Sequence, residues 1–124
     1  MTYRAERAER LMQIVKLRRD ISLATLRRVG QDLSEVTARG VQNDSLVQRA
    51  LTEVDSEDAA TMAAVDSYVQ LMRSRRAKLG TEILKATEEF DAAKDRAALS
   101  FGAVKALEAI GKARPTSDDD AHCG

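Results

Sequence analysis

The sequence predicts an all-α fold, a long antiparallel two-helix coiled-coil hairpin with a short disordered C-terminal tail. Apolar residues recur at alternating spacings of three and four over two long stretches, which is the spacing of a coiled-coil seam. Charged residues make up 32% and aromatic residues 3% of the 124 residues, a composition typical of long helices rather than of wide globular cores. The only proline is Pro115, so the preceding residues contain no strong helix breaker.

We expect the first helix over about residues 2–54, with the Thr2 hydroxyl as its N-terminal cap. Its seam has fifteen positions in unbroken three-four spacing: Ala5, Ala8, Met12, Val15, Arg19, Ser22, Leu26, Val29, Leu33, Val36, Gly40, Asn43, Val47, Ala50 and Val54. Glycine in a helix interior costs about 1 kcal/mol relative to alanine, so residues 39–44 are a rival position for the turn.

The favoured turn lies at about residues 55–58, where Asp55 or Ser56 can cap the second helix. Glu57 and Asp58 would then lie at the positive end of the helix dipole. The two seams end on either side of this segment. Folding the chain here therefore makes one seam the partner of the other.

We expect the second helix over about residues 59–113. Its seam also has fifteen positions: Met62, Val65, Val69, Met72, Arg76, Leu79, Ile83, Ala86, Phe90, Ala93, Ala97, Ser100, Val104, Leu107 and Gly111. In the expected antiparallel register Val47 faces Val69 and Arg76 faces Gly40, which leaves room for the arginine stem to pass towards water. The domain is therefore 2–114, and residues 115–124 form a polar, acidic tail that we expect to be disordered.

The net charge is zero, but the charge is segregated along the chain. Residues 1–28 hold eight basic and three acidic side chains, a net charge of +5, whereas residues 32–67 hold two basic and eight acidic ones, a net charge of −6. Nucleic-acid binders usually carry a large positive charge and aromatic residues for stacking, so we expect no nucleic-acid partner. No apolar run approaches the roughly 18 residues of a membrane span, and we expect a cytoplasmic protein.

The sequence contains no catalytic or metal-binding signature, and we expect neither an enzyme nor a cofactor. His122 and Cys123 are adjacent, but a metal site needs three or four converging ligands and His122 is the only histidine. The single cysteine also excludes a disulfide within the chain. No glycine-rich phosphate loop is present.

Function is expected where apolar residues lie outside the seams. Two groups of these residues should meet where the two termini of the hairpin lie together, accompanied by basic residues. Gathered apolar side chains mark binding surfaces more often than scattered ones. The candidate partner-binding residues are Leu11, Ile14, Leu17, Ile21, Leu99, Phe101, Lys105 and Ile110. They are also compatible with ordinary flanking positions of a coiled coil.

The basic opening at residues 4–19 and the ending at residues 98–114 resemble the FliJ/YscO family of coiled-coil stalk proteins of flagellar and type III secretion export. The segment 104–108, Val-Lys-Ala-Leu-Glu, is similar to the Lys-x-Leu-Glu pattern near the end of that family's second helix. The resemblance covers residues 2–114. Gly102, Gly111 and the ending at 110–114 depart from the family pattern, which affects the tightness of a contact there.

The resemblance implies a non-enzymatic stalk or adaptor that binds a hexameric export ATPase through the end bearing both termini. It also implies contact with the export-gate protein, assistance to substrate chaperones, and a place at the periphery of an inner-membrane export apparatus, with membrane contact only through partners. The chain would be a monomer or a weak dimer. Two alternatives stay open: a structural protein that self-assembles into a four-helix bundle, and an amphipathic binder of a membrane surface.

Overall fold

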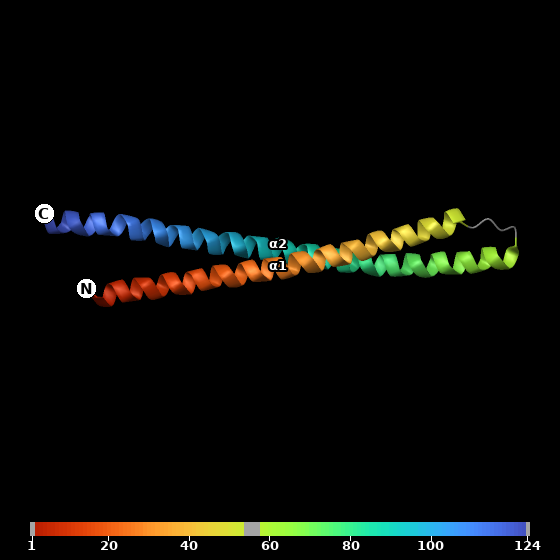
Figure 1. Ribbon diagram of the computed structural model, residues 1–124, viewed down its shortest axis with the longest axis horizontal. Coiled ribbons are helices and arrows are strands. Elements are labelled where there is room, and N and C mark those ends of the chain that lie inside the picture. The colour runs from red at the N-terminus through yellow and green to blue at the C-terminus, as the bar shows by residue number, and fades with distance from the viewer. Residues whose placement is uncertain (1, 54–57, 124) are drawn as a thin grey trace. The chain divides into compact units, whose positions relative to one another are not determined.

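The computed structural model consists of two helices, α1 (Thr2–Glu53) and α2 (Ala59–Cys123), that pack against each other as an all-α hairpin (Figure 1). It describes residues 2–53 and 58–123, with the side chains of 3–53 and 58–112. The described backbone contains no strand. The predicted all-α two-helix hairpin is therefore confirmed.

The helix α1 is continuous through Gly30 and Gly40, which excludes the rival turn at residues 39–44. Both glycines have ordinary helical backbone, since no glycine of the described chain has a positive φ. Both also lie against the second helix, because a Cβ atom on Gly40 would be 3.2 Å from Ile83 Cδ1 and one on Gly30 would be 3.1 Å from Phe90 Cε2. The lost helix propensity is thus offset by close packing of a large side chain.

Asp58 caps the start of α2. Its carboxylate accepts the Ala60 N–H at 3.1 Å and the Thr61 hydroxyl at 3.2 Å, and its carbonyl accepts the Met62 N–H at 3.0 Å. This is the N-cap geometry, in which the cap side chain bonds a free N–H of the first turn. Sequence reasoning placed the cap at Asp55 or Ser56, which lie outside the described residues, and placed Asp58 inside the first turn.

The helix α2 continues to Cys123, further than the predicted end at about residue 113. It passes through Pro115. Proline fixes φ near the helical value, but it lacks the N–H that would bond four residues back and its ring crowds the carbonyl there. The helical backbone therefore continues through Pro115 at a cost of about 3 kcal/mol.

The chain divides into two compact units, each built from one segment of each helix. We call residues Met1–Arg28 with Asp91–Gly124 the terminal unit, and Val29–Phe90 the central unit. Figure 1 shows the two helical segments of each unit running in opposite directions. Side-chain contacts between α1 and α2 occur inside each unit, so each has its own seam.

The central unit has a seam of large apolar side chains with polar groups set among them. Val29, Val36, Val69 and Met72 are buried. Asn43 is also buried and donates from Nδ2 to the carbonyl oxygen of Met72 at 3.2 Å, while its Oδ1 has no partner within the described part of the chain. A polar side chain at a seam position favours one register at a cost in stability.

The predicted contact between Gly40 and Arg76 is present in the central unit. A Cβ atom on Gly40 would be 3.5 Å from Arg76 Cζ, and the guanidinium reaches past it so that Nε donates to Asp44 Oδ1 at 3.0 Å. Gly40 also meets Ile83, one heptad beyond Arg76, so it lies between two seam residues of α2. This is the arrangement of a residue fitting between neighbours on the facing helix.

The seam of the terminal unit is built from smaller side chains. Ala93, Ala97 and Val104 are buried, and Ser22 and Ser100 share a hydrogen bond with 2.9 Å between their hydroxyl oxygens. Met12, Val15 and Leu107 are half-buried, whereas Ala5, Ala8 and Gly111 are exposed. The expected seam positions therefore pack between Met12 and Leu26 on α1 and between Ala93 and Leu107 on α2, and not beyond.

Candidate partner-binding surface

The terminal unit exposes large apolar side chains on both helices. Leu11, Ile14, Leu17 and Ile21 of α1 are each about half exposed, and Leu99, at 75%, is the most exposed large apolar residue of the described chain. Phe101 is 41% and Ile110 56% exposed. Packing in the hairpin accounts for the half-buried seam residues but not for these.

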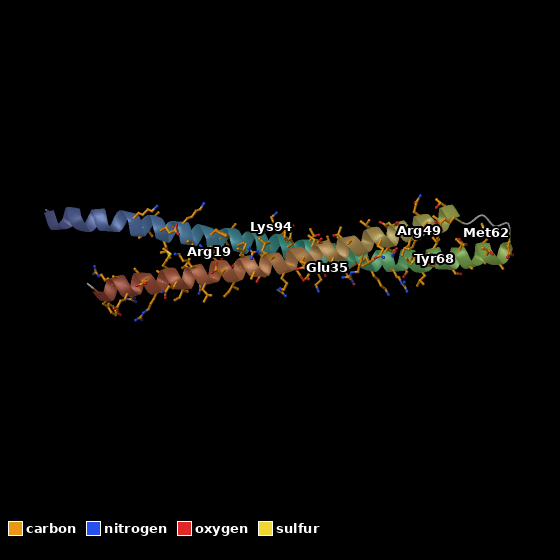
Figure 2. The ribbon with its side chains drawn as sticks, viewed as in Figure 1. Arg19, Glu35, Arg49, Met62, Tyr68 and Lys94 are labelled. Atoms are coloured by element: carbon orange, nitrogen blue, oxygen red, sulfur yellow. The ribbon has the colours of Figure 1, made fainter. Side chains whose placement is uncertain are left out.

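Two contacts mark the two edges of the seam in the terminal unit. On one side, Ser22 and Ser100 share their hydrogen bond. On the other, the Arg19 guanidinium lies 5.9 Å from the centroid of the Phe101 ring, a cation–π arrangement (Arg19 is labelled in Figure 2). We call these the serine side and the Phe101 side. Every residue of the unit can be placed relative to them by its rotation around its helix, about 100° per residue.

Five of the eight predicted site residues lie on the serine side. Ile14 and Ile21 lie about 80° to 100° around α1 from Ser22, in the direction away from Arg19. Leu11 is within about 20° of Ser22. Leu99 and Ile110 lie about 80° to 100° around α2 from Ser100, in the direction away from Phe101. Helix rotation therefore brings these five side chains together.

The other three predicted residues are not part of that surface. Phe101 is about 200° around α2 from Leu99, and Arg19 contacts it on the opposite side of the seam. Lys105, exposed, is on the Phe101 side as well. Leu17 is about 140° from Ser22 and points away from α2. The eight residues are close along the helices but differ in their rotation around them. Leu99 and Phe101, only two residues apart, point to opposite sides for this reason.

The serine side consists of one further stripe in three-four spacing on each helix, which sequence reasoning missed. On α1 the stripe is Arg4, Arg7, Leu11, Ile14, Arg18, Ile21, Thr25 and Arg28, and on α2 it is Ala92, Arg96, Leu99, Ala103, Ala106 and Ile110. All of these residues except Thr25 are exposed. Searching each helix for a second periodic stripe, rather than for surplus apolar residues, would have found them.

The charges of the two sides differ. Neither serine-side stripe contains an acidic residue, and together they carry five arginines. The corresponding stripes of the Phe101 side carry as many acids as bases: Glu6, Glu9, Lys16, Asp20, Arg27, Asp91, Lys94, Lys105, Glu108 and Lys112. The basic character of the terminal unit is therefore concentrated on the face that also exposes its aliphatic side chains.

The central unit also exposes apolar side chains, but without this combination. Val41, Leu51, Met62, Leu71 and Leu84 are each at least half exposed, and Tyr68 is 38% exposed. Met62, Tyr68 and Arg49 are labelled in Figure 2. Its side-chain ion pairs between Arg76 and Asp44 and between Arg49 and Glu53 are exposed and weak. A pair of acid-free stripes in three-four spacing also runs through its described residues, from Gln31 to Thr52 on α1 and from Gln70 to Thr87 on α2, but this pair carries a single arginine, Arg73.

The described residues contain no group of His, Cys, Asp or Glu side chains that could hold a metal ion. The side chains of His122 and Cys123 lie outside those the structure describes. Among the described residues, no helix is long and apolar enough to cross a membrane. The shallow pocket formed by Tyr3, Glu6, Arg7 and Arg10 lies on one face of α1 alone.

Comparison with protein-family models, with curated proteins and with solved structures gave no match to this chain.

Proposed function

We propose that the chain is a non-enzymatic coiled-coil stalk or adaptor of a flagellar or type III protein-export apparatus. Its terminal unit binds the export ATPase ring, and the hairpin assists delivery of substrates and their chaperones at the export gate. The proposal takes its partners from the sequence resemblance to the FliJ/YscO family. The observation that supports it is the concentration of exposed aliphatic side chains and arginines in the unit that contains both termini.

A hairpin of this kind is suited to an adaptor for a physical reason. One seam per helix is enough to hold two helices together, so the remaining faces stay available for partners. Apolar side chains rimmed by arginines favour a partner whose apolar surface is bordered by acids, because complementary charge speeds encounter and selects the partner. Both requirements are met in the terminal unit.

The test is binding to the purified hexameric export ATPase, measured by co-sedimentation of the full chain with the ring. The triple variant Leu11→Asp, Ile14→Asp, Phe101→Asp should lose binding while its helicity, measured by circular dichroism at 222 nm, stays unchanged. The matched control is Val41→Asp, Leu71→Asp, Leu84→Asp in the central unit, which changes the charge equally. Failure of the unmodified chain to bind the ring, or equal loss in both triples, contradicts the proposal.

A second candidate is a self-assembling helical protein in which two hairpins form a four-helix bundle. The exposed Leu71 and Leu84 of the central unit favour it, since dimerisation would cover them. Sedimentation equilibrium separates the two candidates. A stable dimer whose mass does not change with dilution supports the bundle, and a monomer or weak dimer supports the adaptor.

A further inference from the structure

We propose that the serine side of the terminal unit is a docking site for a third helix, supplied by a partner protein as an amphipathic helix with an apolar stripe and flanking carboxylates. This inference deepens the proposed function by naming the kind of segment that the terminal unit takes. It rests on that function only in requiring a protein partner. It does not depend on the partner being an ATPase.

The spacing of the two stripes is the first reason for a helical occupant. Leu11, Ile14 and Ile21 of α1 follow three-four spacing, as do Leu99 and Ile110 of α2. Such spacing lets a straight groove between two helices accept the side chains of a third, in the manner of a coiled coil. Each stripe lies about 100° around its helix from the hairpin seam. The two stripes therefore face the same direction, with the serine pair between them.

The sizes of the side chains are the second reason. On α2 the residues between Leu99 and Ile110 in the stripe are Ala103 and Ala106, both exposed. Small residues at these positions leave room for larger side chains of an incoming helix. On α1 the residues between Leu11 and Ile21 in the stripe are Ile14 and Arg18, whose larger side chains project from it. The groove is therefore lined by small side chains on α2 and by large side chains on α1.

Charge identifies the occupant as acidic. Arg7 and Arg18 alternate with the aliphatic residues of the α1 stripe, and Arg96 precedes Leu99 on α2. Packing a helix over this face would remove water from the guanidinium groups, and guanidinium groups pair best with carboxylates, often through two parallel hydrogen bonds. An occupant with glutamates or aspartates beside its apolar stripe satisfies them.

The same charges exclude a second copy of the chain as the occupant. A twofold dimer through this face would bring the face of one copy against the same face of the other. The joined faces would then hold ten arginines, with no acidic side chain in any of the stripes to pair with them. Like charges brought together at an interface lower its affinity. Dimerisation through the central unit is not affected.

The length of the site sets the length of the probe. The aliphatic part of the stripes runs from Leu11 to Ile21 and from Leu99 to Ile110, which corresponds to about 17 Å, or about three helical turns. The probe is a fluorescein-labelled 21-residue helical peptide with leucines in three-four spacing and glutamates on both flanks. A second peptide has every glutamate replaced by lysine. Binding to the full chain is measured by fluorescence anisotropy.

The decisive variants are paired on the same helix. Arg18→Glu changes the serine side, and Lys16→Glu makes the same change of charge two residues away on the Phe101 side. We expect the acidic peptide to bind the unmodified chain and the lysine peptide not to bind. Arg18→Glu should weaken the acidic peptide by about tenfold or more, and Lys16→Glu by much less. Leu99→Asp should abolish binding, with Leu84→Asp as its control.

Three results would overturn the docking site. The first is equal loss of peptide binding in Arg18→Glu and Lys16→Glu, which would mean general attraction between charges. The second is binding of the lysine peptide as tightly as the acidic one. The third is unchanged binding of the acidic peptide to the Leu99→Asp variant. If vesicles containing phosphatidylserine bind in an Arg18-dependent way while neither peptide binds, the face is a membrane-binding surface instead.

The test of the docking site can fail independently of the test of the proposed function. If the export ATPase binds and Arg18→Glu and Leu99→Asp leave this binding unchanged, the docking site is wrong and the adaptor function stands. If the acidic peptide binds on the serine side and the ATPase does not bind, the docking site stands and the export role is wrong.

Discussion

The central and terminal units are built on the same three-four spacing, but they use it differently. The central unit packs valines and Met72 around polar groups that fix the pairing, namely buried Asn43 and the Arg76–Asp44 pair. The terminal unit buries Ala93, Ala97 and Val104 beside a serine pair, and leaves the larger aliphatic residues of its serine side exposed. A large side chain contributes more to stability when it is buried. The terminal unit thus gives up stability inside the hairpin and keeps apolar area for contact outside it.

Replacing Met72 by alanine should produce the largest effect. Met72 is 4% exposed, and removing a buried methionine side chain leaves a cavity that costs about 2 to 5 kcal/mol in protein cores. In a two-helix seam we expect about 2 kcal/mol, at the lower end of that range. Urea unfolding followed by circular dichroism measures it. The neighbouring Leu71→Ala, at a site 50% exposed, is the control and should change stability far less.

Replacing Asn43 by leucine should raise stability. The Asn43 side chain is buried with Oδ1 unpaired, and leucine removes a desolvated polar group and adds apolar contact, a gain of about 1 to 2 kcal/mol. The same change should loosen the register, because a polar seam residue discriminates against shifted pairings. Crosslinking of cysteines placed at positions 40 and 76, and at pairs one heptad away, reports the register. Lower stability in Asn43→Leu would show that the asparagine contributes more than the single hydrogen bond to Met72.

Replacing glycine by alanine should affect the stability of the two units differently. Gly102 of the terminal unit has open space around it, so Gly102→Ala should gain about 1 kcal/mol of helix propensity. Gly40 of the central unit is in contact with Ile83 and Arg76, so a Cβ there must displace the Ile83 methyl group. Gly40→Ala should therefore gain less than Gly102→Ala or lose stability. Thermal unfolding of both variants under the same conditions decides, and equal gains would contradict the close packing at Gly40.

The Arg76–Asp44 pair should give the smallest effect. The two side chains are 39% and 59% exposed, so water and salt screen the pair, and exposed ion pairs contribute about 0.2 to 1 kcal/mol. A double-mutant cycle with Arg76→Ala and Asp44→Ala should return a coupling in that range that falls with added salt. A coupling that does not respond to salt would show that the pair is shielded within the seam.

Sequence determined the two helices, their seams and the region of the turn. This was possible because residues three and four apart share one face of a helix whatever their partner is. The spacing of apolar residues along the sequence therefore indicates which face of each helix is buried. The contact of Gly40 with Arg76 was predictable for a related reason. A long polar side chain in an apolar seam needs a small residue opposite, and few registers supply one.

The tertiary structure decided what depends on two helices at once. Whether Leu99 and Phe101 lie on one surface follows from their rotation relative to α1, and the Ser22–Ser100 and Arg19–Phe101 contacts fix that rotation. The cap at Asp58 likewise depends on where the backbone enters α2. The spacing along one helix shows which residues share a face of that helix. Which faces of the two helices lie side by side depends on how the helices pack. The acid-free serine side could therefore be identified only in the structure.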